Sequence, residues 1–188
     1  MSFLLHLLRH GALELPGRMM GRTDVAPTPE GIAACVDQIA ELEIEVVIAS
    51  DLRRASQPGA TIATKLALPV STDPRWREMD FGVWDGRMSS EIDPAALRRF
   101  WDDPDAHAPP EGERWSDLTG RVGEAIGELT SRPTLVVTHG GAIRAALAVL
   151  CGFDQRQIWA FDLPYAAMLS LKVWPGEKPS AQIVGLWP

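Results

Sequence analysis

The chain has 188 residues, enough to bury a hydrophobic core without disulfide staples, and this length predicts one domain or one domain with a small insertion. Hydrophobic residues make up 46% of the chain and charged residues 23%, which is ordinary for a globular protein. The formal net charge of −7 argues against a nucleic-acid-binding protein, so any anionic ligand must be held by a local cluster of positive groups.

The first apolar run, residues 3–9, predicts a buried strand. No basic residue precedes it and no small-residue cleavage site follows, so we do not expect a secretory signal. The run is also too short to span a bilayer. On a strand, His6 and His10 are about 13 Å apart, too far to share one ion. We therefore expect no metal site here.

The remaining elements alternate along the chain. Apolar runs at 46–49 and 134–138 predict two more buried parallel strands. A helix should begin after Thr28, which is followed by Pro29 at the first helical position. Further helices are predicted at 114–131, near 141–150 and at Pro94–Asp102, and further strands at 158–162, 168–174 and 183–187. The pattern predicts an α/β sandwich with a mostly parallel central sheet.

The stretch 69–113 is rich in Pro, Asp and Trp and contains the short helix at 94–102. We expect it to leave the sheet and cover a site, as such excursions commonly do in α/β folds. Four tryptophans lie around it, and they either stack on an aromatic substrate or belong to the core, as tryptophans at helical spacing more often do: Trp76, Trp84, Trp101 and Trp115.

Polar residues gather where the predicted parallel strands end. The three strand ends are followed by Arg9-His10-Gly11, by Ser50-Asp51-Leu52-Arg53-Arg54 and by His139-Gly140-Gly141. Ligands bind outside the carboxyl ends of such strands, the glycines let backbone approach a ligand, and helix N-termini add unpaired N–H groups. A lone strand-end histidine or helix-start arginine is usually structural, but their convergence predicts a pocket for a compact dianion such as phosphate.

These motifs resemble those of the histidine phosphatase superfamily, also called phosphoglycerate mutase-like. The resemblance covers nearly the whole chain in the right order, in four segments: Leu8–Gly11, Ser50–Ala55, Arg77–Gly86 and Val137–Gly141. It implies a three-layer α/β sandwich with a mostly parallel sheet of about six strands. Three shorter segments, Gly21–Asp24, Pro110–Glu113 and Ile158–Phe161, are most similar to α-ribazole phosphatases of cobalamin biosynthesis.

The resemblance also implies roles for single residues. His10 would attack phosphorus through one ring nitrogen while a backbone carbonyl holds the other. Arg9, Arg53 and His139 would bind the non-bridging oxygens, with the backbone at Gly140 close to the substrate. Glu78 would protonate the departing alkoxide and then activate water.

Some positions are less clear. Arg22 either contacts the substrate or is a solvated loop arginine. Many family members have an acidic or polar residue and an Asn where this chain has Ala12 and Pro16, so one expected polar phosphate contact is missing. Pro58 implies a kink, or a helix that begins only at Ser56.

The favoured hypothesis is a phosphatase for a small phosphorylated substrate, such as α-ribazole 5′-phosphate. The alternatives are a phosphoglycerate mutase, which the short chain disfavours, and a non-catalytic phosphate- or phosphoprotein-binding module, which the presence of both His10 and Glu78 disfavours. We expect no cofactor, no nucleic acid or membrane partner, and a monomer or homodimer. Cys35 and Cys151 form no CxxC pair and favour buried free thiols in a cytoplasmic protein.

Overall fold

A six-stranded sheet forms the centre of the protein in a computed structural model that describes residues 1–188, with strand order β3-β2-β4-β1-β5-β6. The strands are β1 (Phe3–Arg9), β2 (Val46–Ala49), β3 (Val70–Thr72), β4 (Thr134–Thr138), β5 (Met168–Trp174) and β6 (Ser180–Trp187). The first four are parallel, whereas β5 and β6 are antiparallel additions beside β1. The predicted α/β fold with a mostly parallel sheet of about six strands is confirmed.

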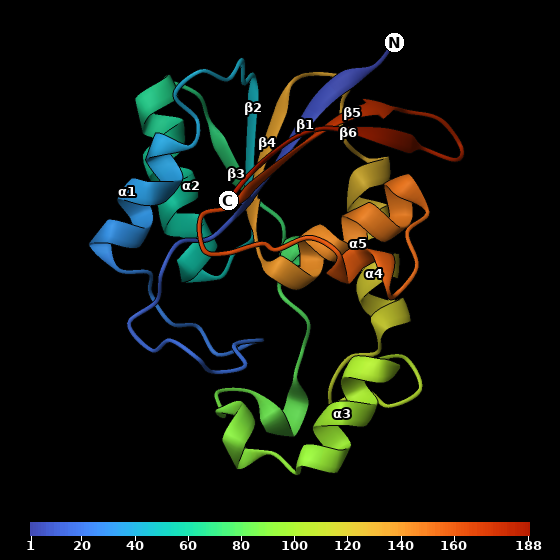
Figure 1. Cartoon of the computed structure of the whole chain (residues 1–188). Helices are drawn as coiled ribbons and strands as arrows, with labels where there is room; N and C mark the ends of the chain where they lie inside the picture. Colours follow the sequence, from blue (N-terminus) through green and yellow to red (C-terminus); the bar gives the residue numbers. More distant parts are fainter.

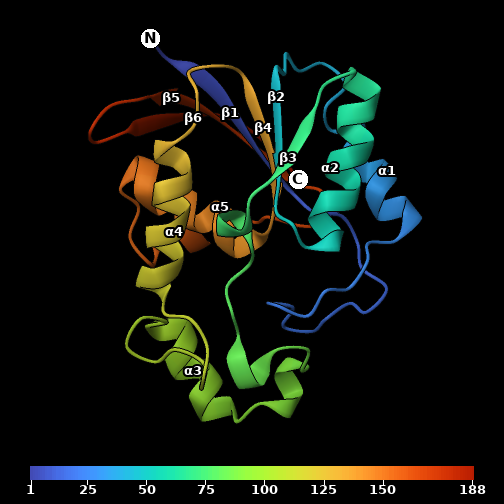
Figure 2. The ribbon, with the colours of Figure 1, turned by 180° about the vertical axis from the view of Figure 1, so that it is seen from behind.

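Helices cover both faces of the sheet. Helices α1 (Pro29–Asp37) and α2 (Arg53–Leu66) lie on one face, and α4 (Trp115–Gly127) and α5 (Gly140–Cys151) lie on the other (Figures 1 and 2). Helix α3 (Pro94–Asp102) lies beyond the edge at which β1 ends (Figure 1). Four short 3₁₀ helices complete the set: η1 (Pro74–Trp76), η2 (Gly82–Trp84), η3 (Ser89–Glu91) and η4 (Gln157–Trp159). No helix is long and apolar enough to cross a membrane.

The central strands are buried on both faces, and alternate residues divide between two layers of the core. Leu7 and Val136 belong to the larger cluster, which includes residues of α4 and α5. Leu8 and Val137 belong to the smaller cluster, which includes residues of α1 and α2. This is why both strands appear in the sequence as continuous apolar runs and not as alternating ones.

The predicted helix start at Thr28 is confirmed, because its Oγ accepts a hydrogen bond of 3.0 Å from the N–H of Gly31. Helix α5 ends at Gly152, whose φ of 66° suits the left-handed cap position. Helix α2 begins at Arg53 and continues past Pro58, so the later start at Ser56 was wrong.

Two other points of the sequence analysis need correction. The strand predicted at 158–162 is instead the end of the 3₁₀ helix η4 followed by a bend, and its buried residue Ile158 packs into the larger core cluster. Strand β3 was missed because its three residues are all exposed at the sheet edge. The stretch 69–113 therefore contributes this strand before it leaves the sheet.

Two of the four tryptophans around that stretch belong to the core, and the other two do not lie fully within it. Trp76 and Trp84 are buried in the larger cluster, together with Phe100 of α3. Trp101 is 42% exposed and Trp115 is half-buried. Cys35 is buried and Cys151 half-buried, and neither forms a disulfide.

The loop after β1 lies directly against the start of α1 because two glycines meet there. A Cβ on Gly11 would lie 2.0 Å from the carbonyl oxygen of Gly31, and a Cβ on Gly31 would lie 2.6 Å from the backbone of Ala12. Only glycine at both positions allows this approach, which fixes the backbone next to His10.

We predict that Gly11→Ala lowers the free energy of unfolding by about 2 kcal/mol, because the backbone atoms opposite cannot move away without shifting α1. Urea denaturation with fitted m-values measures the change. Gly120→Ala in α4 is the control: a Cβ there meets no atom within 4 Å, so stability should rise by up to about 1 kcal/mol. A Gly11→Ala protein as stable as the wild type would contradict the close packing.

Candidate active site

Three neighbouring strands deliver the polar residues of the site to one edge of the sheet. His10 follows β1, Ser50 follows β2 and His139 follows β4, and these strands are adjacent in the order β2-β4-β1. The rings of His10 and His139 lie 5.2 Å apart between centroids. The convergence predicted from the strand ends is therefore present in the structure.

His10 is held in one tautomer by its own loop. Its Nδ1 lies 2.9 Å from the carbonyl oxygen of Gly11. A carbonyl can only accept, so Nδ1 carries the proton and Nε2 keeps a free lone pair. Burial, together with the charges of Arg54 and Arg9, lowers the pKa of His10 to about 3, although the hydrogen bond to Gly11 acts in the opposite direction. The ring is neutral at neutral pH, as a nucleophile must be.

The ring of His139 is fixed from both sides. Arg54 Nε donates to its Nδ1 at 3.2 Å, so the ring proton lies on Nε2, which donates to Ser50 Oγ at 2.9 Å. Burial and the Arg54 charge lower its pKa well below the ordinary value. Because both nitrogens are engaged, a contact between His139 and a phosphate oxygen would have to replace one of these hydrogen bonds.

Arg54 is the arginine that α2 places in the site, and the prediction of Arg53 at this position was wrong. Arg54 is fully buried, whereas the Arg53 side chain is exposed. Besides His139, the Arg54 guanidinium donates to three backbone carbonyls, those of Met20, Gly21 and Thr23. The helical pattern held the signal, because Arg54 lies one and two turns before the buried Pro58 and Ile62.

Arg9 lies beside His10 in a cavity of about 230 Å³. Its Nη1 donates to the carbonyl of Leu163, and its guanidinium carbon lies 4.6 Å from the ring centroid of Tyr165. The buried Nε has no hydrogen-bond partner. Tyr165 also approaches the His10 ring, at 5.5 Å between centroids. The Tyr165 ring therefore fixes the orientation of the positively charged Arg9 guanidinium.

Glu78 lies at the N-terminus of α5. Its Oε2 accepts a hydrogen bond of 3.1 Å from the N–H of Gly141, and its Oε1 accepts one of 2.8 Å from the N–H of Met79. A Cβ on Gly141 would lie 2.1 Å from Oε1, so only glycine leaves room for the carboxylate. Glu78 lines the cavity that holds His10 and also a second cavity of about 270 Å³, which Gly140 lines as well.

Arg22 lies apart from this group. Its Nε donates to Asp80 at 3.2 Å, and it lines neither cavity. Asp80 in turn accepts from the backbone N–H of Gly82. The structure therefore places Arg22 with a carboxylate of the neighbouring loop and away from His10.

Sequence reasoning did not single out Tyr165 or Arg144, and it named Ser50 and Arg54 only within the motif after β2, without a role of their own. Arg54 alone had a usable signal, in the helix periodicity. Tyr165 follows β1 by some 150 positions in the chain and meets His10 only because the turn before β5 returns to the end of β1, where the N–H of Ala166 donates to the carbonyl of His10.

The model of one family, the histidine phosphatase superfamily (branch 1), matches residues 5–184. The chain belongs to this superfamily. Among curated relatives, a glucosyl-3-phosphoglycerate phosphatase of Mycolicibacterium vanbaalenii is 33% identical over 164 residues, covering 78% of this chain and 73% of that protein. A protein of Proteus mirabilis named as a probable phosphoglycerate mutase is 31% identical over 160 residues, covering 78% of this chain and 74% of its own length.

Solved structures of the superfamily agree with the fold. A mycobacterial glucosyl-3-phosphoglycerate phosphatase in complex with VO3 matches with a TM-score of 0.87 at 26% identity, covering 98% of both chains. The relatives of this histidine phosphatase superfamily member thus include phosphatases and a protein named for mutase activity.

We predict that His10 stays neutral far into the acid range. The Cε1 resonance of ¹³C-labelled His10, assigned with His10→Asn, should not titrate between about pH 8 and about pH 5, because burial and two arginines disfavour the imidazolium. A midpoint near the ordinary histidine value would contradict the structure.

The same depressed pKa has a consequence for stability. Below about pH 6.5 the unfolded chain binds a proton on His10 that the folded chain does not bind. Neutral His10 therefore makes its full contribution to the free energy of unfolding above that pH. The contribution is lost as the pH falls toward the folded pKa of about 3.

Proposed function

We propose that this protein hydrolyses a small phosphomonoester through a phosphohistidine on His10. The observation that carries the proposal is the neutral His10 ring, with Nδ1–H bound to Gly11 and a free lone pair on Nε2, flanked by the positive charges of Arg9 and Arg54. A neutral nucleophile beside two cations suits attack on a phosphate dianion. Relatives that are phosphatases support the same reaction.

The proposed reaction has two steps. First, Nε2 of His10 forms a bond to phosphorus, the bond from phosphorus to the ester oxygen breaks, and Glu78 gives its proton to the departing alkoxide. In the second step Glu78 takes a proton from water, the oxygen of that water bonds to phosphorus, and the bond to Nε2 breaks. Inorganic phosphate leaves and His10 is neutral again.

The cations act where charge builds up on the phosphoryl oxygens. Arg9 lines the cavity with His10 and supplies a positive charge there. Arg54 supplies a buried positive charge behind the two histidine rings. His139 keeps Arg54 in place, and the backbone at Gly140 lies at the first turn of α5, where unpaired N–H groups favour an anion.

Two substrates are candidates. α-Ribazole 5′-phosphate follows from the three short segments most similar to α-ribazole phosphatases, and glucosyl-3-phosphoglycerate follows from the curated relative. The segment 69–113 covers the site in either case, since its Phe81 and Trp101 line both cavities. We place the protein in the cytoplasm, which its two free cysteines support.

The second candidate function is that of a phosphoglycerate mutase, favoured by the Proteus mirabilis relative. A mutase uses the same phosphohistidine but returns the phosphoryl group to the substrate. Incubation with 3-phosphoglycerate distinguishes the two: free phosphate supports hydrolysis, and 2-phosphoglycerate supports the mutase.

We predict that Glu78→Gln traps the intermediate. With p-nitrophenyl phosphate, whose leaving group needs no proton, the variant should release about one equivalent of nitrophenolate in a burst and retain an acid-labile phosphoryl group. With an alkyl phosphate it should show no burst. His10→Ala should give neither burst nor label, and full turnover by His10→Ala would end the proposal.

We predict opposite outcomes for two adjacent arginines. Arg54→Lys should lower kcat/KM for p-nitrophenyl phosphate by about 100-fold or more, since it loses hydrogen bonds that orient His139 and moves the buried charge. Arg53→Lys, with the same change on an exposed side chain, should alter it by about twofold or less. Circular dichroism should show that both variants are folded. Equal effects at the two positions would show that Arg54 has no special role.

A further inference from the structure

The second cavity adjoins the one that holds His10. The two share Arg9, Glu78, Phe81 and Trp101 among their lining residues. Under the proposed function, on which this inference rests, Glu78 gives its proton to the leaving oxygen. The phosphoryl group then lies on the His10 side of Glu78, and the cavity of about 270 Å³ on the other side receives the leaving group.

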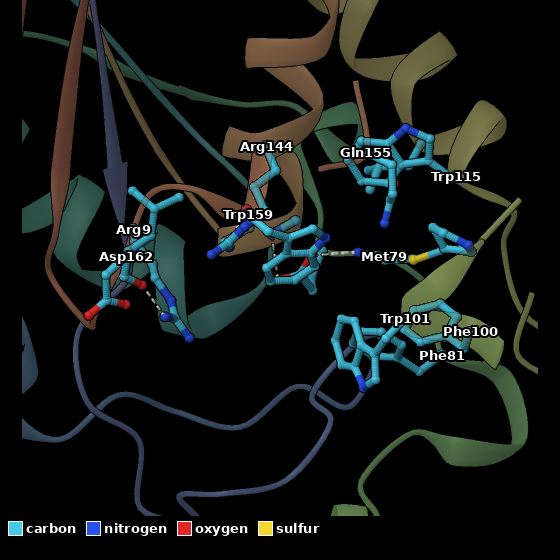
Figure 3. A pocket seen from close by; sticks show the side chains of 16 residues that line it. Arg9, Met79, Phe81, Phe100, Trp101, Trp115, Arg144, Gln155, Trp159 and Asp162 are labelled. Carbon is cyan, nitrogen blue, oxygen red and sulfur yellow. Dashed lines mark hydrogen bonds between the residues drawn. The ribbon is translucent and has the colours of Figure 1, made fainter. Parts of the chain in front are cut away.

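Arg144 is a charged residue of this cavity that has no ion-pair partner in the protein. It lies one turn into α5, and its guanidinium carbon is 4.1 Å from the ring centroid of Trp159 (Figure 3). The Trp159 ring meets Trp101 edge-on at 5.1 Å between centroids. The aromatic pair fixes the plane of the guanidinium and forms a wall of the cavity beside it.

The hydrogen bonds of Arg144 within the protein are few and long. Nη1 reaches the carbonyl of Gly140 at 3.3 Å and Nη2 that of Phe161 at 3.4 Å, whereas such bonds are commonly about 2.9 Å. The Nε atom is buried and has no partner. No carboxylate forms an ion pair with it. Burial lowers the pKa of Arg144, and the nearby charges of Glu78 and Asp162 oppose this lowering only in part.

We propose that Arg144 is a specificity residue that binds a carboxylate on the leaving group of the phosphomonoester. A planar guanidinium with weakly engaged N–H groups matches the two oxygens of a carboxylate. A second phosphate is a poorer match, because Asp162 lines the same cavity and would repel a dianion more strongly than a monoanion. The apolar or ring part of the leaving group packs on Trp101 and Trp159.

Two substrates that differ only in the carboxylate test this. 3-Phosphoglycerate and glycerol 3-phosphate carry the same phosphate ester, with a carboxylate in one where the other has a hydroxymethyl group. The wild type should prefer 3-phosphoglycerate in kcat/KM for phosphate release. Arg144→Gln should lower that preference by about 10- to 100-fold, the range expected for a lost charge-assisted hydrogen bond.

Arg156→Gln is the matched control, since it removes the same charge from an exposed residue that lines neither cavity. It should keep the wild-type preference. Arg144→Lys keeps the charge but loses the planar guanidinium that can bind both carboxylate oxygens, so it should lose part of the preference. It also tests the proposal if Arg144→Gln does not fold. Equal losses on both substrates, or an unchanged preference in the Arg144 variants, would overturn the proposal.

A binding measurement separates this inference from the proposed function. Calorimetry with glycerate and with glycerol needs no turnover. Glycerate should bind the wild type more tightly than glycerol does, and Arg144→Gln should remove the difference. If no phosphomonoester is hydrolysed but this pattern holds, the proposed function fails and the carboxylate site stands. If hydrolysis proceeds and the pattern is absent, the carboxylate site fails alone.

Discussion

The buried guanidinium of Arg54 is the constraint on which the rest of the site depends. A charge with no exposed surface is costly unless hydrogen bonds satisfy it, and here four acceptors do so: His139 Nδ1 and three carbonyl oxygens of the loop at residues 20–23. Arg54 thereby fixes the ring of His139 and holds that loop against α2. Burial is the main cause of the lowered pKa of His10 and His139, and the Arg54 charge lowers both further.

This arrangement meets two requirements of phosphoryl transfer with the same groups. The nucleophile must be neutral, and the substrate dianion must meet positive charge. Burial and the arginines keep His10 unprotonated, and under the proposed function the same arginines supply the positive charge for the anion. The protein as a whole has a formal charge of −7, yet exposed charges are screened beyond about 8–10 Å in physiological salt. The local cluster therefore decides the sign of the field at His10.

The sequence was sufficient for what depends on local pattern. Strands β1, β2 and β4 were predicted at their observed bounds because continuous apolar runs have no stable place except between two helical layers. The ends of these strands then predicted where His10, Arg9 and His139 lie. Arg54 was predicted one position too early because the motif was placed without using the burial pattern of α2, in which position 53 points outward.

What could not be predicted depends on packing between distant segments. Strand β3 has three exposed residues and forms only because β2 offers it an edge. Trp76 and Trp101 look alike in the sequence, yet one is fully buried and the other is 42% exposed at the cavity wall. The surroundings of Arg144 are set by η4 and by the segment around α3, and nothing in the local pattern fixes how these two pack together.

Helix α5 connects the chemistry to the choice of substrate. Its N-cap is His139, its second residue Gly141 binds Glu78 through the backbone, and Arg144 follows one turn later. Because a helix is stiff over so short a length, the distances between these three positions are nearly fixed. Under the proposed function, a leaving group whose carboxylate binds Arg144 would therefore have its ester oxygen at a set distance from Glu78. Recognition of the leaving group and delivery of the proton would then depend on the same rigid element.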